Sequence, residues 1–185
     1  MTATDTTAPA GFDYEALAKT LANSTPDNLH STIVNAPFSC PMQAAMLFLG
    51  IVVLLIVDEE AGTINRVALS DTELAKNTTD VSMVPFEEIK IPLNNDENII
   101  AQAIRSGELH DTTDWRFLFT PVLNAEDARI NQASGGIAYS AVYPLKTTPR
   151  AAMIFSYFQY AHDIGEQQHE FMKLYSELVA AQLSR

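Results

Sequence analysis

The sequence predicts an α+β domain in which helices cover both faces of a central antiparallel β-sheet and a long helix ends the chain. Two pairs of consecutive strands, 51–57 with 64–69 and 137–145 with 151–160, each enclose a short polar turn, which is typical of β-hairpins. Helical patterns precede, separate and follow these hairpins, so both faces of the sheet can be covered. Apolar residues make up 47% of the 185 residues, enough for the core of one compact domain.

Three short helices are expected before the first strand. Residues 12–23 carry apolar side chains at helical spacing. A second helix begins at Thr25-Pro26-Asp27 and extends to Pro37, because proline suits the first helical turn and ends a helix that reaches it. Ser39-Cys40-Pro41 begins a third helix that ends at Gly50. We therefore predict a tail and a short helix at residues 1–25, followed by the domain proper at 26–185.

The most apolar stretch, residues 44–57, contains 14 residues without a polar side chain. A membrane-spanning helix needs about 20 residues, and Asp58-Glu59-Glu60 follow directly, so we interpret this stretch as a helix running into a buried strand. The N-terminus has neither the basic residues nor the apolar block of a secretory signal. The single cysteine fits a reducing compartment. We predict a cytoplasmic domain without a membrane partner.

Shorter elements are predicted between the two hairpins. Residues 70–82 show a weak helical pattern, and 88–93 form a short strand. Asn94-Asn95-Asp96 is expected to cap a helix that ends at Gly107. Residues 116–118 are expected to form a short edge strand, and the last element before the second hairpin is a short helix at 125–133.

The terminal helix, predicted at 164–184, carries two apolar stripes. We expect one stripe, which includes Met172, Tyr175 and Val179, to pack on the sheet. The other repeats at intervals of seven residues, as in helices that pair with a partner helix. Its predicted dimer-interface residues are Phe171, Leu174, Leu178 and Ala181. The alternative is one wide stripe buried wholly within a single subunit.

Three passages of the chain resemble the GAF family of sensor domains. Residues 51–68 resemble the family's opening hairpin with its acidic-glycine turn, and 91–114 resemble its strand and helix ending in a "TGE" turn, with Ser106 in place of threonine. The hairpin at 136–158, followed by the terminal helix, resembles the closing part of the family, with Ala152 where glycine is usual. The related PAS fold is the main alternative, but PAS domains usually end on a strand. The resemblance spans residues 26–185 and implies small-molecule sensing and a homodimer formed through the first and last helices.

The resemblance implies a ligand pocket between the sheet and the loops around the middle helices. Aromatic side chains there would stack on a flat ligand, and nearby polar groups, Asn131 among them, would orient it. The alternative is that these rings simply form core. The candidate ligand-binding residues are Trp115, Arg116, Phe117, Phe119, Arg129, Tyr139, Ser140 and Tyr143.

Several functional classes are disfavoured by the sequence. Its net charge of −12 would repel nucleic acid and anionic membranes. The Asn-Lys pair of cyclic-nucleotide-binding GAF domains is absent, and Cys40 lies far upstream of the usual bilin-attachment region. One thiol cannot close the internal disulfide that a methionine sulfoxide reductase cycle uses. Glu166 and His169 have metal-ligand spacing, but no matching motif occurs on another helix, so no metal is predicted and any cofactor is unknown.

These observations lead to one functional hypothesis and two alternatives. The hypothesis is a non-enzymatic sensory or regulatory domain in which a small molecule changes the geometry of a helical dimer interface. One alternative is a ligand-free protein–protein interaction module whose aromatic side chains fill the pocket. The other is a redox enzyme that uses Cys40, since a thiol at a helix start can be reactive.

Overall fold

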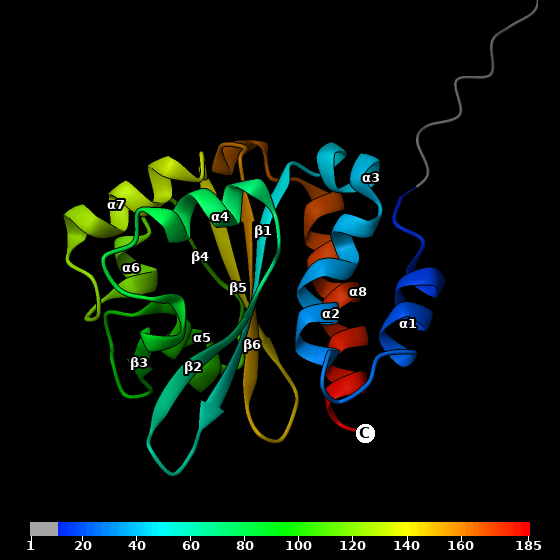
Figure 1. The fold of residues 1–185 in the computed structure, drawn as a ribbon, viewed down its shortest axis with the longest axis horizontal. Coiled ribbons are helices and arrows are strands. Elements are labelled where there is room, and N and C mark those ends of the chain that lie inside the picture. Colours follow the sequence, from blue (N-terminus) through cyan, green and yellow to red (C-terminus); the bar gives the residue numbers. More distant parts are fainter. Residues whose placement is uncertain (1–10) are drawn as a thin grey trace, which may run out of the picture.

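A computed structural model of the chain describes residues 11–185 and shows a six-stranded sheet between two layers of helices (Figure 1). The spatial order of the strands is β3-β2-β1-β6-β5-β4, and every neighbouring pair is antiparallel. Both predicted hairpins, β1–β2 and β5–β6, are present, and pairing of β1 with β6 joins them at the centre of the sheet. The strands are β1 (Leu49–Asp58), β2 (Thr63–Leu69), β3 (Lys90–Pro92), β4 (His110–Thr112), β5 (Tyr139–Leu145) and β6 (Ala151–Tyr157).

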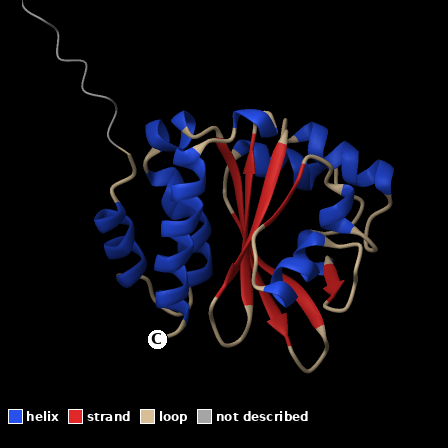
Figure 2. Cartoon of the chain, turned by 180° about the vertical axis from the view of Figure 1, so that it is seen from behind, coloured by secondary structure: helices blue, strands red, loops and turns tan. Residues whose placement is uncertain are grey.

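Helices cover both faces of the sheet, as predicted (Figures 1 and 2). One face, which we call the bundle face, carries α1 (Tyr14–Ala22), α2 (Leu29–Asn35), α3 (Pro41–Met46) and α8 (Glu166–Leu183). The opposite face carries α4 (Glu73–Asp80), α5 (Ile99–Ser106), α6 (Arg116–Phe119) and α7 (Ala125–Ser134). Short 3₁₀ turns lie at 36–39, 86–88 and 161–163. No helix within residues 11–185 combines the length and the apolar character needed to span a membrane.

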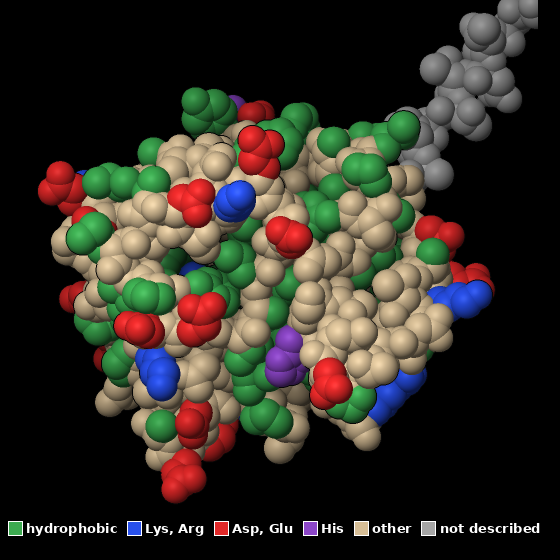
Figure 3. Space-filling model, viewed as in Figure 1, with side chains coloured by type: hydrophobic (Ala, Val, Ile, Leu, Met, Phe, Trp, Pro, Cys, Tyr) green, Lys and Arg blue, Asp and Glu red, His purple; other side chains and the backbone are tan. Residues whose placement is uncertain are grey.

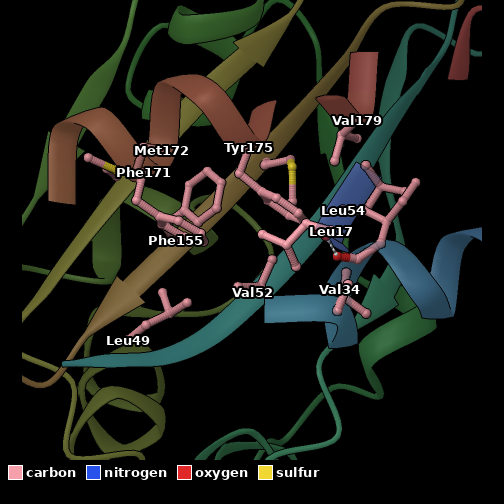
Figure 4. Close-up of a cluster of buried hydrophobic side chains, with 14 of the residues drawn as sticks. Leu17, Val34, Leu49, Val52, Leu54, Phe155, Phe171, Met172, Tyr175 and Val179 are labelled. Carbon is pink, nitrogen blue, oxygen red and sulfur yellow. Dashed lines mark hydrogen bonds between the residues drawn. The ribbon is translucent and has the colours of Figure 1, made fainter. Parts of the chain in front are cut away.

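The core of the bundle face is packed with aromatic and aliphatic side chains from α8 and the central strands (Figure 4). Met172, Tyr175 and Val179 of α8 are fully buried, which confirms that this stripe of the helix packs on the sheet. The hydroxyl of Tyr175 donates a hydrogen bond of 2.6 Å to the carbonyl oxygen of Ile33 in α2. This bond satisfies a buried polar group and ties the last helix to the second.

Helix α1 packs on α8 and so belongs to the same core. The rings of Phe12 and Phe171 stack with centroids 4.5 Å apart, and Leu17 and Leu21 are buried beside them. Asp13 begins the helix, because its side chain accepts a hydrogen bond from the backbone N–H of Ala16. The other part of the predicted N-terminal segment, residues 1–10, lies outside the described residues.

Helix α5 has a different cap from the one predicted. The side-chain oxygen of Asn98, rather than Asn94-Asn95-Asp96, accepts hydrogen bonds from the N–H groups of Ile100 and Ala101, at 2.9 and 3.2 Å. Its side-chain amide also donates to the carbonyl of Thr120 at 2.8 Å, so the cap anchors the loop after α6. A long-range contact of this kind cannot be read from local spacing. The helix ends at Gly107, as predicted, with a positive φ of 72°.

The third helix ends earlier than predicted, and Gly50 lies inside strand β1. Helix α3 stops at Met46, and Phe48 supplies the left-handed conformation, with φ 58°. Gly50 serves close packing instead, because a Cβ there would lie 2.8 Å from Leu74 Cδ1 and 3.2 Å from Ile137 Cδ1. The glycine therefore lets α4 and the start of β5 approach the strand.

Residues 116–118 form the start of α6 rather than the predicted edge strand. Trp115 is the N-cap of this helical turn, and the carboxylate of Asp114 just before it accepts a hydrogen bond of 2.9 Å from the N–H of Arg116. The edge strand is β4, at residues 110–112, which pairs with β5. Short apolar runs do not distinguish helix from strand by periodicity, and here the turn formed by Asp114 favours the helix.

Candidate ligand-binding cavity

A cavity of about 40 Å³ lies on the opposite face, between the central strands and helices α4, α6 and α7. Its base is formed by apolar side chains of β1 and β6, including Ile51, Val53 and Ile154. Because one water needs roughly 10–15 Å³ of such volume, the cavity has room for about three water-sized groups. Figure 3 shows a hollow on the left of this view, with Lys or Arg atoms visible inside it. We call this side of the sheet the cavity face.

Arg66 is the one charged side chain that lines this cavity among the described residues. It lies on β2 in the same parity as buried Ile64, so the strand directs it inward, and it is only 8% exposed. Its Nε and Nη2 atoms are buried without a hydrogen-bond partner within residues 11–185. Burial lowers the pKa of Arg66 to about 10, so the side chain remains charged at neutral pH.

The charged group of Arg66 lies against aromatic rings rather than beside an acid. Its guanidinium carbon lies 4.3 Å from the ring centroid of Phe119 and 6.0 Å from that of Phe86. Such cation–π contacts stabilise a cation by about 0.5–2 kcal/mol, less than the several kcal/mol that burial of an unpaired charge costs. No Asp or Glu of the described chain lines the cavity. The unliganded site therefore holds an uncompensated positive charge.

A chain of hydrogen bonds runs behind one wall of the cavity. The indole N–H of Trp115 donates to the hydroxyl of Ser140 at 2.8 Å, and the hydroxyls of Ser140 and Ser156 lie 2.8 Å apart. All three residues are buried. Trp115 and Ser156 line the cavity, so the bonded chain holds the indole against the sheet and brings a hydroxyl to the wall.

Asn131 of α7 supplies a buried acceptor to the same cavity. Its amide nitrogen donates to the hydroxyl of Ser82 at 3.2 Å, and that hydroxyl donates to the carbonyl of Val84 at 2.7 Å. Its side-chain oxygen has no hydrogen-bond partner within residues 11–185. Unpaired buried polar atoms are rare in folded proteins, and here they line one cavity on two sides.

The predicted site residues divide into three groups. Trp115 and Phe119 line the cavity, and Ser140 supports it through the indole of Trp115. Arg116 and Arg129 lie on the surface, where they pair with Asp114 at 3.5 and 3.3 Å and do not reach the cavity.

Three predicted aromatic residues do not line the cavity. Tyr139 and Tyr143 point to the bundle face, because side chains alternate along β5 and Ser140 occupies the cavity-side position between them. Burial, followed by the nearby Asp111 carboxylate, raises the pKa of Tyr139 well above its usual range. Phe117 lies outside the cavity with the guanidinium of Arg116 over its ring, 4.4 Å from the centroid.

Sequence reasoning missed Arg66, the residue with the most unusual environment in the site. A signal for it was present, because Arg66 lies two residues after Ile64 in a predicted strand and so has the same parity as an apolar position. An arginine at an inward position indicates either a buried partner or a ligand. The described residues 11–185 contain no group of three or more His, Cys, Asp or Glu side chains placed to hold a metal ion.

Neither a family sequence model nor a curated protein sequence matches the chain, but its fold matches solved structures over most of its length. The GAF domain of an Acinetobacter phosphoenolpyruvate-protein phosphotransferase covers 92% of this chain and 89% of its own, at 10% identity and a TM-score of 0.60. The fold is that of a GAF domain.

Two further structures show that the GAF fold occurs with different activities. A methyl-accepting chemotaxis protein, residues 122 to 287, covers 91% of this chain and 94% of its own, at 11% identity and a TM-score of 0.57. A free methionine-R-sulfoxide reductase from Neisseria meningitidis, in complex with its substrate, covers 92% and 85%, at 11% identity and a TM-score of 0.59. At identities this low, the structural matches establish the GAF fold of the chain, and its function has to be argued from the site.

Proposed function

We propose that this chain is a cytoplasmic, non-enzymatic sensory GAF-like domain that binds a small molecule in the cavity. The observation that carries this proposal is the set of unpaired polar atoms in one cavity: two donors of Arg66 and the side-chain oxygen of Asn131. Leaving such atoms buried without partners costs free energy, which a ligand with complementary groups would recover. The cytoplasmic location is supported by the single cysteine.

Ligand binding would be transmitted across the sheet through the alternation of side chains in β6. Ser156 lines the cavity, while the preceding Phe155 points to the bundle face and packs edge-on against Phe171 of α8, with centroids 5.8 Å apart. Phe171 in turn stacks on Phe12, ahead of α1. A small shift of β6 at the cavity would therefore move the first and last helices. A ligand that binds one arrangement of these helices more tightly would increase its population.

We also propose that the chain forms a homodimer through α8, with a smaller interface than the sequence predicted. Phe171 is only 1% exposed inside its own subunit, so it cannot contribute surface to a partner. Leu174 and Leu178 are partly exposed and Ala181 is exposed. Light scattering should give twice the mass of one chain at high concentration. A mass of one chain at every concentration would contradict the dimer and leave ligand binding standing.

A redox enzyme remains the second candidate function because a methionine sulfoxide reductase shares the fold. Cys40 is partly buried before α3 on the bundle side and does not line the cavity. Replacing Cys40→Ser should leave the behaviour of the protein toward peroxide and sulfoxides unchanged. Loss of a sulfoxide-reducing activity in that variant would favour the enzyme.

Thermal unfolding against a panel of nucleotides, nucleobases, amino acids, indoles, tetrapyrroles and small organic acids tests the sensory proposal. A ligand at 100 times its Kd stabilises the folded state by about 2.7 kcal/mol, which raises the Tm of a domain this size by several degrees. A shift with one compound class would support the sensor and name its ligand class. A flat response across the panel would favour the ligand-free interaction module.

A further inference from the structure

The two unpaired nitrogens of Arg66, Nε and Nη2, correspond to the two nitrogens through which another arginine of this chain binds a carboxylate. Arg150, at the start of β6, donates through Nε and Nη2 to the two carboxylate oxygens of Glu59, each at 2.7 Å. These two nitrogens form one edge of the planar guanidinium, and their parallel N–H groups match the spacing of carboxylate oxygens. In Arg66 the same edge is buried and unpaired within residues 11–185.

We propose that the cavity binds a small carboxylate whose two oxygens accept hydrogen bonds from Nε and Nη2 of Arg66. This inference rests on the proposed sensory function and names the chemical class of its ligand. A carboxylate would neutralise the one charge of the cavity without displacing an internal partner, because no Asp or Glu lines the wall. It would also leave the guanidinium on the ring of Phe119.

The other groups of the cavity narrow the class of carboxylate. Asn131 presents an unpaired acceptor, so the ligand should carry a hydrogen-bond donor beyond its carboxylate. A hydroxyl fits this position better than an ammonium group, because the cavity holds a positive charge and no acid to balance a second one. The volume of about 40 Å³ and the apolar base favour a short chain. Together these features favour a short hydroxycarboxylate.

Phosphate fits the cavity less well than a carboxylate does. A phosphate dianion is stabilised by several donors arranged around it, whereas this cavity offers one guanidinium edge and the hydroxyl of Ser156. The hydroxyls of Thr78, Thr79 and Ser82 also line the cavity, but each already donates to a backbone carbonyl. The remaining wall is largely apolar, with Leu69, Ile89 and Leu118 among its side chains. Inorganic phosphate is therefore a useful control, because it is an anion like the carboxylates but is not expected to bind.

The position of Trp115 provides a direct assay, since it is the single tryptophan of the sequence and lines the cavity. Tryptophan fluorescence should change in a saturable way with glycolate and lactate, more weakly with acetate, and not with lactamide or inorganic phosphate. Lactamide keeps the shape of lactate but removes its charge. Acetate keeps the carboxylate but removes the donor for Asn131.

Variants at two arginines distinguish the loss of an arginine in the cavity from the loss of one on the surface. Arg66→Met keeps an unbranched apolar stem but removes the guanidinium and its charge, and it should weaken glycolate and lactate binding at least tenfold. Arg150→Met removes an arginine whose edge is already occupied by Glu59, and it should leave binding unchanged. Arg66→Lys keeps the charge but loses the planar pair of donors, and it too should bind at least tenfold more weakly. Arg66→Lys also serves as the test if Arg66→Met does not fold.

The outcomes distinguish this inference from the sensory proposal on which it rests. Lactamide binding as tightly as lactate, or equal lactate binding by wild type and Arg66→Lys, would overturn the carboxylate assignment. Wild type that responds to no carboxylate but is stabilised by an uncharged compound of the thermal panel would overturn this inference and keep the sensor. Wild type that responds to nothing would overturn both.

Discussion

The two faces of the sheet differ in what their cores contain. On the bundle face, the ring of Phe171 stacks on Phe12 and on Tyr175, at centroid distances of 4.5 and 5.5 Å. Within residues 11–185, that face also buries the hydroxyls of Tyr157 and Ser176 without partners, but it buries no charged side chain. The cavity face instead keeps Arg66 unpaired beside empty volume. The comparison teaches that the ring-packed core and the cavity with its unpaired polar atoms lie on opposite sides of one sheet, and five experiments test this division.

The largest expected effect is unfolding at alkaline pH, driven mainly by the bundle face. Burial raises the pKa of Tyr139, Tyr157 and Tyr175 well above the ordinary value of 10, and it raises that of Tyr14 to about 12. Above pH 10 the unfolded chain releases these protons first. Tyr157 and Tyr175, which are fully buried, then each lower the free energy of unfolding by about 1.4 kcal/mol per pH unit until the folded pKa is reached. Tyr14 is half-buried and contributes less, because water screens it.

Arg66 acts in the opposite direction over the same range. Its folded pKa of about 10 lies below the ordinary value of 12.5, so its contribution to stability rises with pH between those values. Several tyrosines outweigh one arginine, and the net stability should fall. With tyrosinate absorbance and circular dichroism recorded together against pH, the part of the absorbance that comes from the buried tyrosines should appear in one cooperative step with the loss of secondary structure. Tyrosine ionisation completed before any loss of secondary structure would contradict burial of these side chains.

The second expected effect is the difference between removing a ring from each face. Phe171→Ala should lower the free energy of unfolding by about 3–5 kcal/mol, because the residue is fully buried among other rings. Phe86→Ala, at the partly exposed edge of the cavity, should cost about 1–2 kcal/mol, since neighbouring space already exists. Urea denaturation measures both variants. Equal costs would show that the two faces are equally well packed.

The third expected effect concerns the contact between β1 and the helices of the cavity face. Gly50→Ala should cost about 1–3 kcal/mol, because the added methyl would overlap Leu74 and crowd Ile137. Gly11→Ala is a suitable control, since an added methyl there meets no atom within 4 Å. Thermal denaturation of the two variants measures the difference. An unchanged Tm for Gly50→Ala would show that α4 moves freely over the strand.

The fourth experiment tests whether Arg66 is retained for binding at the expense of stability. Arg66→Met should raise the free energy of unfolding of the unliganded protein by about 1–2 kcal/mol, because it removes a buried charge that has no partner. Chemical denaturation without added ligand measures it. A clear loss of stability would mean that the cation–π contact with Phe119 outweighs the cost of burying the charge.

The smallest expected effect is at the exposed ion pair between the tips of the two hairpins. Glu59→Gln removes one charge of the pair with Arg150, whose hydrogen bonds lower the pKa of the Glu59 carboxyl. Both side chains are well exposed, so water screens their attraction and the change in Tm should lie within experimental error. A drop as large as that of Gly50→Ala would show that the hairpin tips are coupled in folding.

Local patterns predicted the elements of this protein where a strong apolar period repeats. Both hairpins, helix α5 ending at Gly107 and the buried stripe of α8 follow from such periods. The predictions were wrong where the segment was short, as at 116–118, or where a distant contact decided, as at Asn98 and Gly50. At Asn98 and Gly50 the free energy of a long-range contact exceeded the local preference.

The candidate site was predicted in part. Trp115 and Phe119 were placed in the pocket from the resemblance, and the structure puts both on the cavity wall. Tyr139 and Tyr143 were placed in the pocket together with Ser140, although the alternation of side chains along β5 puts these tyrosines on the face opposite Ser140. Arg66 was missed because what distinguishes it is the burial of two donors without partners, and this depends on where all the neighbouring elements pack.

The sequence by itself determined the order of elements, the antiparallel hairpins and the helices that cover both faces, since each follows from the spacing of apolar residues along the chain. Only the tertiary structure decided that α1 packs beside α8, that Gly50 serves close contact, and that Arg66 lies unpaired in a cavity. The physical reason is distance along the chain. Periodicity records which face of an element is apolar, whereas an empty volume or a missing partner is a property of elements far apart in sequence that meet at one place.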